Sequence, residues 1–411
     1  MATLRPFRAL RPQPGKAAQV SAVPYDVVSA AEARELAAGN PLSFLHVSRA
    51  EIDLPDGTSS YSDSVYEKAA ENFDRLKRDA GMLIEDAPSL YLYRLRMGGH
   101  EQTGIAACCS IQEYDSDVIR KHERTRKDKE DDRTRHMIAL GAQTGPVFLT
   151  YRGRSDIDEI VTIAKEKEAL YDFVAPGGVQ HTMWRLPAAS DDLTRIFLSV
   201  PVLYIADGHH RAASASRAAR QLRDAAHHGT TDVESEYFLA VVFPADQLKI
   251  LAYNRVVNGL NGMEPDRFLA SLRERFVVTE GAPAEPGTKG HISMYLGGTW
   301  YSLRVSGEHP ERHGDPISSL DVSVLEKTVL DPLLGIKDVR TDKRIDFVGG
   351  IRGASALDQM VDNGRATVAF SMYPVSLDEL MAVADTGQIM PPKSTWFEPK
   401  LRDGLLIHLL K

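Results

Sequence analysis

Apolar residues follow two different spacings along this chain, short unbroken runs and helical repeats. After Pro201, the apolar run 202–206 predicts a short buried strand, and the segment rich in Ala and Arg up to about residue 226 predicts a helix. Residues 61–80 repeat apolar positions at helical spacing until Gly81. Residues 89–96 and 102–111 flank a Gly-Gly turn, which predicts a hairpin.

The remaining pattern predicts further helices and strands on both sides of these elements. Ser29 is an N-cap with Glu32 at the capping-box position, so a helix is expected up to Gly39. The other predicted helices cover 156–172, 264–275, 320–331, 354–363 and 376–386, with one more starting at Ser190. The other predicted strands cover 42–47, 145–151, 237–243, 251–257 (near the preceding strand), 290–296, 299–305, 345–348 and 366–371.

These helices and strands together predict an α+β fold, that is, a mixed α/β protein, which we expect to be divided into three modules. We expect an N-terminal α/β module over 1–100, a phosphate-binding core over 101–258, and a C-terminal α+β domain over 259–411. Met390 to Lys400, in the tail of the last domain, combines two prolines, two lysines and two aromatic residues. The tail either packs on the core or closes over a site.

Composition narrows the function classes. The 411 residues are 43% hydrophobic and 26% charged, as in an ordinary globular protein. The net charge of −8 argues against a nonspecific nucleic-acid binder, although a local basic patch is compatible with it. No run approaches the ~18 apolar residues of a membrane span. The cysteines are adjacent (Cys108, Cys109) and form no CxxC motif, which fits a reducing compartment. We therefore expect a cytoplasmic protein without a membrane partner; a homodimer is compatible with the sequence.

The candidate chemistry is concentrated at residues 207–211, Asp-Gly-His-His-Arg, between the predicted strand and helix. Free backbone N–H groups and the positive end of the helix dipole meet there, which favours an anion. Gly208 allows close approach, Arg211 offers a planar fork for phosphate oxygens, and Asp207 can hold Mg²⁺ or orient a histidine. The alternative is a tight turn whose histidines, His209 and His210, are capping or solvated. Cations in a first turn oppose the dipole unless an anion is bound, which favours a phosphate site.

Two further segments have both a structural and a functional interpretation. The charged run 121–136 is typical of a solvated helix with i,i+4 ion pairs. In the functional interpretation Glu123 is a base, while Arg126, Lys127 and Arg133 face phosphates. In the tail, the aromatic residues are explained by docking on the core, whereas Lys393, Ser394 and Thr395 form a reasonable phosphate-contacting trio.

The sequence contains neither a Walker-type loop nor a Rossmann GxGxxG. The segment 207–211 resembles the phosphate-binding box of the ParB/sulfiredoxin superfamily. Within that superfamily, it is most similar to the Asp-Gly-His-His-Arg box of free serine kinases. Those kinases also carry an upstream His-Glu whose carboxylate is the catalytic base, and His122-Glu123 is similar. The resemblance implies a ParB/sulfiredoxin-like core, a nucleotide site that includes His122, and Glu123 as base.

More broadly, the chain resembles a large bacterial family, domain of unknown function 1015. The family pattern is found here as Pro24-Tyr25-Asp26, His122-Glu123-Arg124-Thr125, the 207–211 box and Met390 to Thr395. The chain departs from the compact kinases in two ways. About 80 residues separate the His-Glu from the box, and the C-terminal domain has no counterpart in small sulfiredoxins.

Three functions follow as hypotheses. The first is a small-molecule kinase for free L-serine or a similar amino acid, with Mg²⁺ as cofactor and ATP, ADP or another phosphate donor as co-substrate. Here Glu123 accepts the hydroxyl proton, Asp207 holds Mg²⁺, and the box binds phosphates. The second is a ParB-like nucleotide-binding regulator without turnover, although no basic recognition helix stands out. The third, a sulfiredoxin-like reductase, needs a cysteine where His209 stands.

Overall fold

The computed structural model describes residues 1–187, 190–225, 233–306 and 314–411, and shows the mixed α/β architecture expected from the sequence. Its contacts divide the chain into two units. Unit 1 comprises residues 1–121, 125–248 and 399–411, and unit 2 comprises residues 122–124 and 249–398. The three-module division expected from the sequence, with boundaries near residues 100 and 258, stays a prediction.

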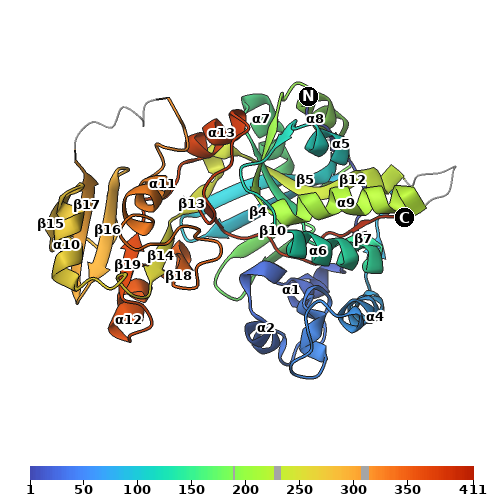
Figure 1. The fold of residues 1–411 in the computed structure, drawn as a ribbon. Helices are drawn as coiled ribbons and strands as arrows, with labels where there is room; N and C mark the ends of the chain where they lie inside the picture. The colour runs from blue at the N-terminus through green and yellow to red at the C-terminus, as the bar shows by residue number, and fades with distance from the viewer. Residues whose placement is uncertain (188–189, 226–232, 307–313) are drawn as a thin grey trace. The chain divides into compact units, whose positions relative to one another are not determined.

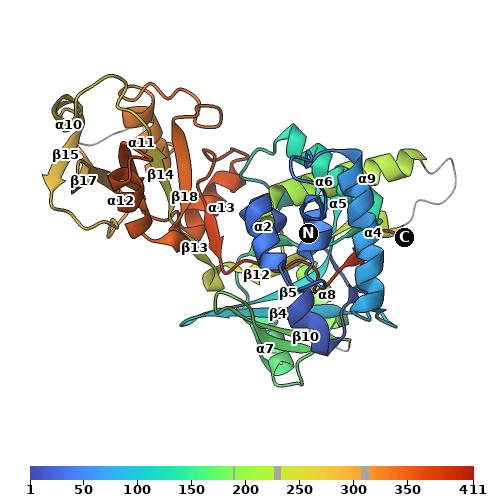
Figure 2. The ribbon, with the colours of Figure 1, turned by 90° about the horizontal axis from the view of Figure 1, so that it is seen from below.

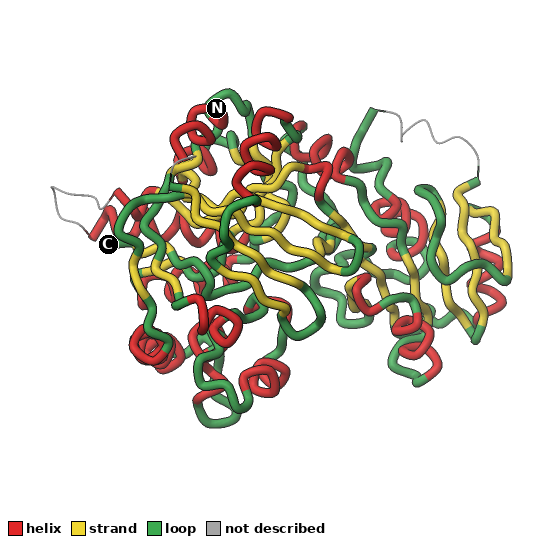
Figure 3. The backbone as a smooth tube through the Cα atoms, turned by 180° about the vertical axis from the view of Figure 1, so that it is seen from behind, coloured by secondary structure: helices red, strands yellow, loops and turns green. Residues whose placement is uncertain are grey.

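A mixed sheet forms the centre of unit 1 (Figures 1 and 3). Its strands run in the order β6-β11-β8-β12-β5-β4-β10-β9, and β1 pairs with β5 off this path. Neighbours are antiparallel except for the parallel pairs β6–β11 and β8–β12. The strands are β1 (Leu4–Arg5), β4 (Leu90–Met97), β5 (His100–Ser110), β6 (Ile119–Arg120), β8 (Val147–Tyr151), β9 (Tyr171–Val174), β10 (Gln180–Leu186), β11 (Leu203–Asp207) and β12 (Tyr237–Pro244).

Helices from all parts of unit 1 cover this sheet. Its main core combines apolar residues of the strands with those of α7 (Ser155–Lys165), α8 (Ser190–Phe197) and α9 (His209–Ala225). Helix α9 packs against α6 (Lys127–Leu140), and α6 packs in turn against α4 (Asp63–Asp79), as Figure 2 shows. The remaining elements are α1 (Ala17–Val20), α2 (Ala30–Ala37), α3 (Leu45–Ser48), α5 (Ile111–Asp115), and the strand pairs β2 (Leu10–Arg11) with β3 (Leu83–Ile84) and β7 (Ala142–Gln143) with β21 (His408–Leu409).

Unit 2 is built on an antiparallel sheet of order β15-β17-β16-β19-β14-β18. Alternate residues enter two separate cores: Met294 and Phe370 join the core that contains α10, α11 and α13, whereas Tyr295 and Ala369 pack with α12. The elements are β14 (Tyr253–Val257), α10 (Pro265–Arg273), β15 (Phe276–Glu280), β16 (His291–Leu296), β17 (Thr299–Val305), α11 (Asp321–Leu325), β18 (Ile345–Gly349), α12 (Ser355–Asp362), β19 (Val368–Ser371), α13 (Leu377–Asp385) and the pair β13 (Lys249–Leu251) with β20 (Trp396–Glu398).

Four local predictions need correction. Residues 42–47 are not a strand, because Leu45–Ser48 form one helical turn whose start is held by the Ser43 hydroxyl, which accepts from the Leu45 N–H at 3.3 Å. The 251–257 segment pairs in the sheet of unit 2, not beside β12. The 156–172 helix stops at Lys165, and its last residues enter β9. The charged run is helical only from Lys127 onward.

Candidate functional site at the strand–turn–helix of residues 207–211

The strand–turn–helix predicted around residue 208 is confirmed. Strand β11 ends at Asp207 and α9 begins at His209. Gly208 between them has φ +91°, a conformation that L side chains rarely adopt. The Gly208 carbonyl accepts from the N–H groups of Arg211 and Ala212. A helix start of this kind presents backbone donors and a positive dipole end to an anion.

Asp207 is an ionised carboxylate held by a lysine of the C-terminal segment. Its Oδ1 accepts from the Gly208 N–H at 2.9 Å, and its Oδ2 pairs with the Lys400 ammonium at 2.7 Å. Burial raises the pKa of Asp207, but Lys400 and then Arg211 outweigh it and hold that pKa well below its ordinary value. Lys400 was not among the candidate residues. Its only sequence signal is its place in the unusual tail.

Arg211 is almost entirely buried and is surrounded by acceptors from three distant parts of unit 1. Its Nη1 donates to the Pro146 carbonyl at 2.9 Å and lies 3.7 Å from Asp403 Oδ1, and its Nη2 donates to Asp26 Oδ1 at 3.3 Å. The guanidinium carbon is 5.5 Å from the centre of the Tyr25 ring. The Pro-Tyr-Asp motif and the 207–211 box therefore meet at Arg211.

The two histidines of the box differ in their surroundings. His209 is 5% exposed, and burial lowers its pKa to about 3, so it is neutral at physiological pH. The Nε2 atom of His210 accepts from the backbone N–H of Arg126 at 3.0 Å. This contact joins the box to the residue just before α6. His209 and His210 therefore form part of the packing around the turn.

The other predicted phosphate ligands and the predicted base belong to unit 2. The His122 carbonyl accepts from the Met390 N–H at 2.8 Å, so the His-Glu motif and the tail motif meet there. Glu123 is half-buried in a bend, three residues before Arg126 along the chain. The expected roles of Glu123 as base and of Asp207 as metal ligand stay predictions.

The tail trio forms a tight turn in unit 2. Lys393 has φ +60°, a left-handed conformation that is strained for a residue with a Cβ. Its carbonyl accepts from the buried Arg255 at 3.1 Å, and the Ser394 hydroxyl donates to the Pro391 carbonyl at 2.6 Å. Thr395 is half-buried. Strain of this kind concentrates at functional positions, which keeps Lys393 a candidate phosphate ligand.

The basic residues of the charged run are engaged locally. Arg126 pairs with Asp128 and Lys127 with Asp131, as expected for a solvated helix start. Arg133 instead lies over the Tyr25 ring at 4.1 Å and pairs with Asp132 at 2.8 Å. Of these three side chains, only that of Arg133 contacts Tyr25, the ring that also packs against Arg211.

Within the described part of the chain, no three His, Cys, Asp or Glu side chains are grouped as a metal site would need. Asp207 supplies a single carboxylate. The site therefore fits a Mg²⁺ ion that is bound together with substrate phosphates, where phosphate and water oxygens supply most of the ligands. Every helix in the described ranges is too short or too polar to span a bilayer.

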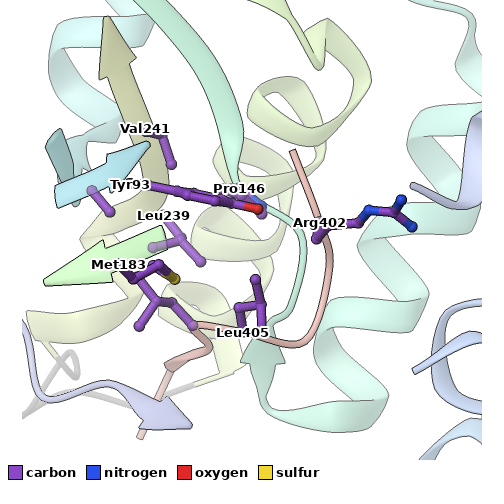
Figure 4. A pocket seen from close by; sticks show the side chains of 9 residues that line it. Tyr93, Pro146, Met183, Leu239, Val241, Arg402 and Leu405 are labelled. Atoms are coloured by element: carbon purple, nitrogen blue, oxygen red, sulfur yellow. The ribbon is translucent and has the colours of Figure 1, made fainter. Parts of the chain in front are cut away.

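A small cavity lies near this site in unit 1, beneath the C-terminal segment (Figure 4). Its volume is about 10 Å³, which is at most room for one water molecule. Tyr93, Met183 and Leu405 line it, while the Arg402 side chain extends away from them. This cavity is too small for any substrate.

We expect unit 1 to lose stability as the pH falls below neutrality. Burial lowers the pKa of His136 to about 4 and that of His181 and His209 to about 3. Between pH ~6.5 and 4 the unfolded chain binds a proton at each of these histidines and the folded chain does not. Each histidine therefore lowers the unfolding free energy by about 1.4 kcal/mol for each unit that the pH falls. Burial raises the pKa of Asp403 to about 6, which acts in the opposite sense and offsets one histidine.

Urea unfolding at pH 7.5, 6.5 and 5.5 measures this dependence. The unfolding free energy should fall with pH, and His136→Gln should reduce the slope. An unfolding free energy that is the same at all three pH values would contradict the prediction.

The fold and the site together define a mixed α/β protein in which an aspartate ends a strand and a glycine links it to the following helix. The particular family follows from the sequence: residues 4–323 match the family described as protein of unknown function (DUF1015), and the chain belongs to it. A search of curated proteins gave no match.

Several solved structures resemble the chain at low sequence identity. A free serine kinase in complex with AMP is 13% identical, with 72% of this chain and 86% of that one covered and a TM-score of 0.35. A conserved hypothetical protein from Pyrococcus furiosus is 14% identical, with coverages of 74% and 95% and a TM-score of 0.35. SbnI with a C-terminal truncation, from Staphylococcus aureus, is 12% identical, with coverages of 74% and 89% and a TM-score of 0.39. TM-scores below 0.5 do not establish a shared fold.

Proposed function

We propose that this chain is a small-molecule phosphotransferase that transfers a phosphoryl group from a nucleotide or another phosphate donor to the hydroxyl of free L-serine or a similar amino acid. The observation that carries the proposal is the Asp207 carboxylate, paired with Lys400, at the end of a strand directly before a helix N-terminus. An anion-binding turn beside a fixed carboxylate and a lysine suits phosphoryl transfer, in which catalysis is mostly positioning and charge neutralisation.

In this proposal the donor phosphates bind the Gly208 turn and the first-turn amides of α9. Lys400 and Arg211 supply positive charge beside them, and Arg211 does so while it remains bound to Asp26 and Asp403. A magnesium ion that enters with the donor would be held by Asp207 and would neutralise phosphate charge. The unit 2 residues His122, Lys393, Ser394 and Thr395 add phosphate contacts.

Glu123 is the base in this proposal. The serine Oγ forms a bond to the terminal phosphorus, the bond from that phosphorus to the donor oxygen breaks, and the Oγ proton passes to the Glu123 carboxylate. That the Glu123 carboxylate reaches a serine bound at the box is part of this proposal.

Mass spectrometry tests the proposed activity directly. The protein is incubated with Mg²⁺, ATP or ADP, and L-serine, and O-phosphoserine is measured against an arm with a chelator. Asp207→Asn should abolish the product, because it removes the carboxylate that pairs with Lys400, whereas the matched control Asp192→Asn, in an exposed pair with Arg195, should not. Thermal unfolding of both variants separates lost chemistry from lost folding.

Three results would count against the proposal. Absence of O-phosphoserine with every donor would remove serine as the acceptor. Full activity of Asp207→Asn would remove the turn as the donor site. Nucleotide binding without turnover on any amino acid would favour the nucleotide-binding regulator instead.

A further inference from the structure

A polar pocket of about 150 Å³ lies in unit 1, between the segment 49–61 and helix α6. At about 10–15 Å³ per water molecule on this measure it has room for roughly ten waters, which is enough for a small metabolite. The residues that line it are mostly ionic or hydroxyl-bearing: Tyr25, Arg49, Glu51, Ser59, Ser60, Tyr61, Lys129, Asp132 and Arg133.

The charged groups of this pocket are nearly buried and already paired. Arg49 Nε lies 3.1 Å from Glu51 Oε1, and the two side chains are 18% and 8% exposed. Arg133 pairs with Asp132 at 2.8 Å, and Asp132 also accepts from the Tyr66 hydroxyl at 2.9 Å. Taking charged groups out of water costs desolvation free energy, which these pairings offset.

The pairing leaves ionic atoms of both signs unused. Among the residues that the structure describes, the two terminal nitrogens of Arg49 donate no hydrogen bond, and Glu51 Oε2 accepts none. Glu51 Oε1 takes both the Arg49 contact and a 3.5 Å hydrogen bond from the Ser60 hydroxyl. A planar fork of donors and a single carboxylate oxygen thus remain for a ligand.

This arrangement matches a small zwitterion better than a simple anion. The fork of Arg49 suits a carboxylate, and the free oxygen of Glu51 suits an ammonium group. Three cations and two carboxylates line the pocket, so a phosphate or sulfate could pair with the Arg49 fork, but it has no donor for Glu51 Oε2, whereas an ammonium group has one. The Lys129 ammonium contacts the Tyr61 hydroxyl at 2.8 Å at the more exposed side of the pocket.

We propose that this pocket is a binding site for a free α-amino acid, with the ligand carboxylate on Arg49 and the ligand ammonium on Glu51. The pocket shares Tyr25 with the surroundings of Arg211, since the ring lies 4.1 Å from the Arg133 guanidinium and 5.5 Å from that of Arg211. The site is independent of the proposed phosphoryl transfer, because binding needs neither a donor nor a reactive hydroxyl.

Calorimetry on the full chain without donor tests the site with four probes. L-Alanine has both ionic groups and no hydroxyl, lactate lacks the ammonium, ethylamine lacks the carboxylate, and inorganic phosphate is a plain anion. L-Alanine should bind, ethylamine and phosphate should not, and lactate should bind at least tenfold more weakly. The result that overturns the proposal is L-alanine binding no better than lactate and ethylamine.

Variants assign the binding to this pocket. Arg49→Gln should weaken L-alanine at least tenfold, and Glu51→Gln should weaken L-alanine but not lactate, whereas the exposed control Arg195→Gln should change neither. Ser60→Ala, a milder change, tests the site if a charge variant fails to fold, and should weaken L-alanine a few-fold. Asp207→Asn should leave L-alanine binding intact, which separates this site from the proposed activity. Unchanged L-alanine binding in folded Arg49→Gln or Ser60→Ala would overturn the assignment.

Discussion

Glu123→Gln is expected to lower the turnover of phosphoryl transfer by about 10²–10⁴-fold, the usual contribution of a general base. A serine hydroxyl is a poor nucleophile at neutral pH, and glutamine keeps the shape of the side chain but cannot take the hydroxyl proton. Glu123 lies in a half-buried bend before α6, not on its solvated face. Turnover is measured as O-phosphoserine formed in a single-turnover experiment.

The same variant should keep its donor affinity and its stability. The phosphates are proposed to bind at the Gly208 turn, so nucleotide affinity by calorimetry and the urea midpoint should match the wild type. Asp128→Asn is the control, because this exposed carboxylate pairs only with Arg126 in the same charged run and should not affect turnover. Wild-type turnover in Glu123→Gln would move the base elsewhere, first to Asp207.

The parts of the fold that the sequence predicted are those set by local interactions. The capping box of Ser29 and Glu32, the hairpin turn at Gly98 and the strand–turn–helix around Gly208 each depend on residues within a few positions. The same holds for α4, whose buried face was readable from its spacing. Local signals therefore located the candidate box and the elements that flank it.

The partners of the box could not be predicted because they come from distant segments. Asp207 meets Lys400 across 193 positions, and Arg211 meets Asp26 across 185. The pocket beside α6 likewise joins Arg49 to Arg133. The short segment 42–47, Leu-Ser-Phe-Leu-His-Val, also carries no signal that separates a strand from a helical turn, and packing decided between them.

Arg211→Met is expected to destabilise unit 1 by about 3–5 kcal/mol, the range for removing one partner of a buried ion pair. The variant leaves the carboxylate of Asp403, itself 2% exposed, without the guanidinium 3.7 Å away, and removes a donor from the Pro146 carbonyl. The prediction is measured as the change in unfolding free energy from urea titrations. A loss of nucleotide affinity in this variant is interpretable only after this measurement.

The pH dependence of that loss identifies its cause. Burial raises the pKa of Asp403 to about 6, and Arg211 opposes this rise, so removing Arg211 raises the pKa further. The folded state then binds a proton that the unfolded chain releases above pH ~3.9, and stability falls as the pH rises through the folded pKa. Arg211→Met should therefore lower the unfolding free energy less at pH 5 than at pH 8. Adding Asp403→Asn to this variant should restore part of the unfolding free energy at pH 8 only. An equal cost at both pH values would mean that Arg211 stabilises unit 1 by packing against Tyr25 and not through its charge.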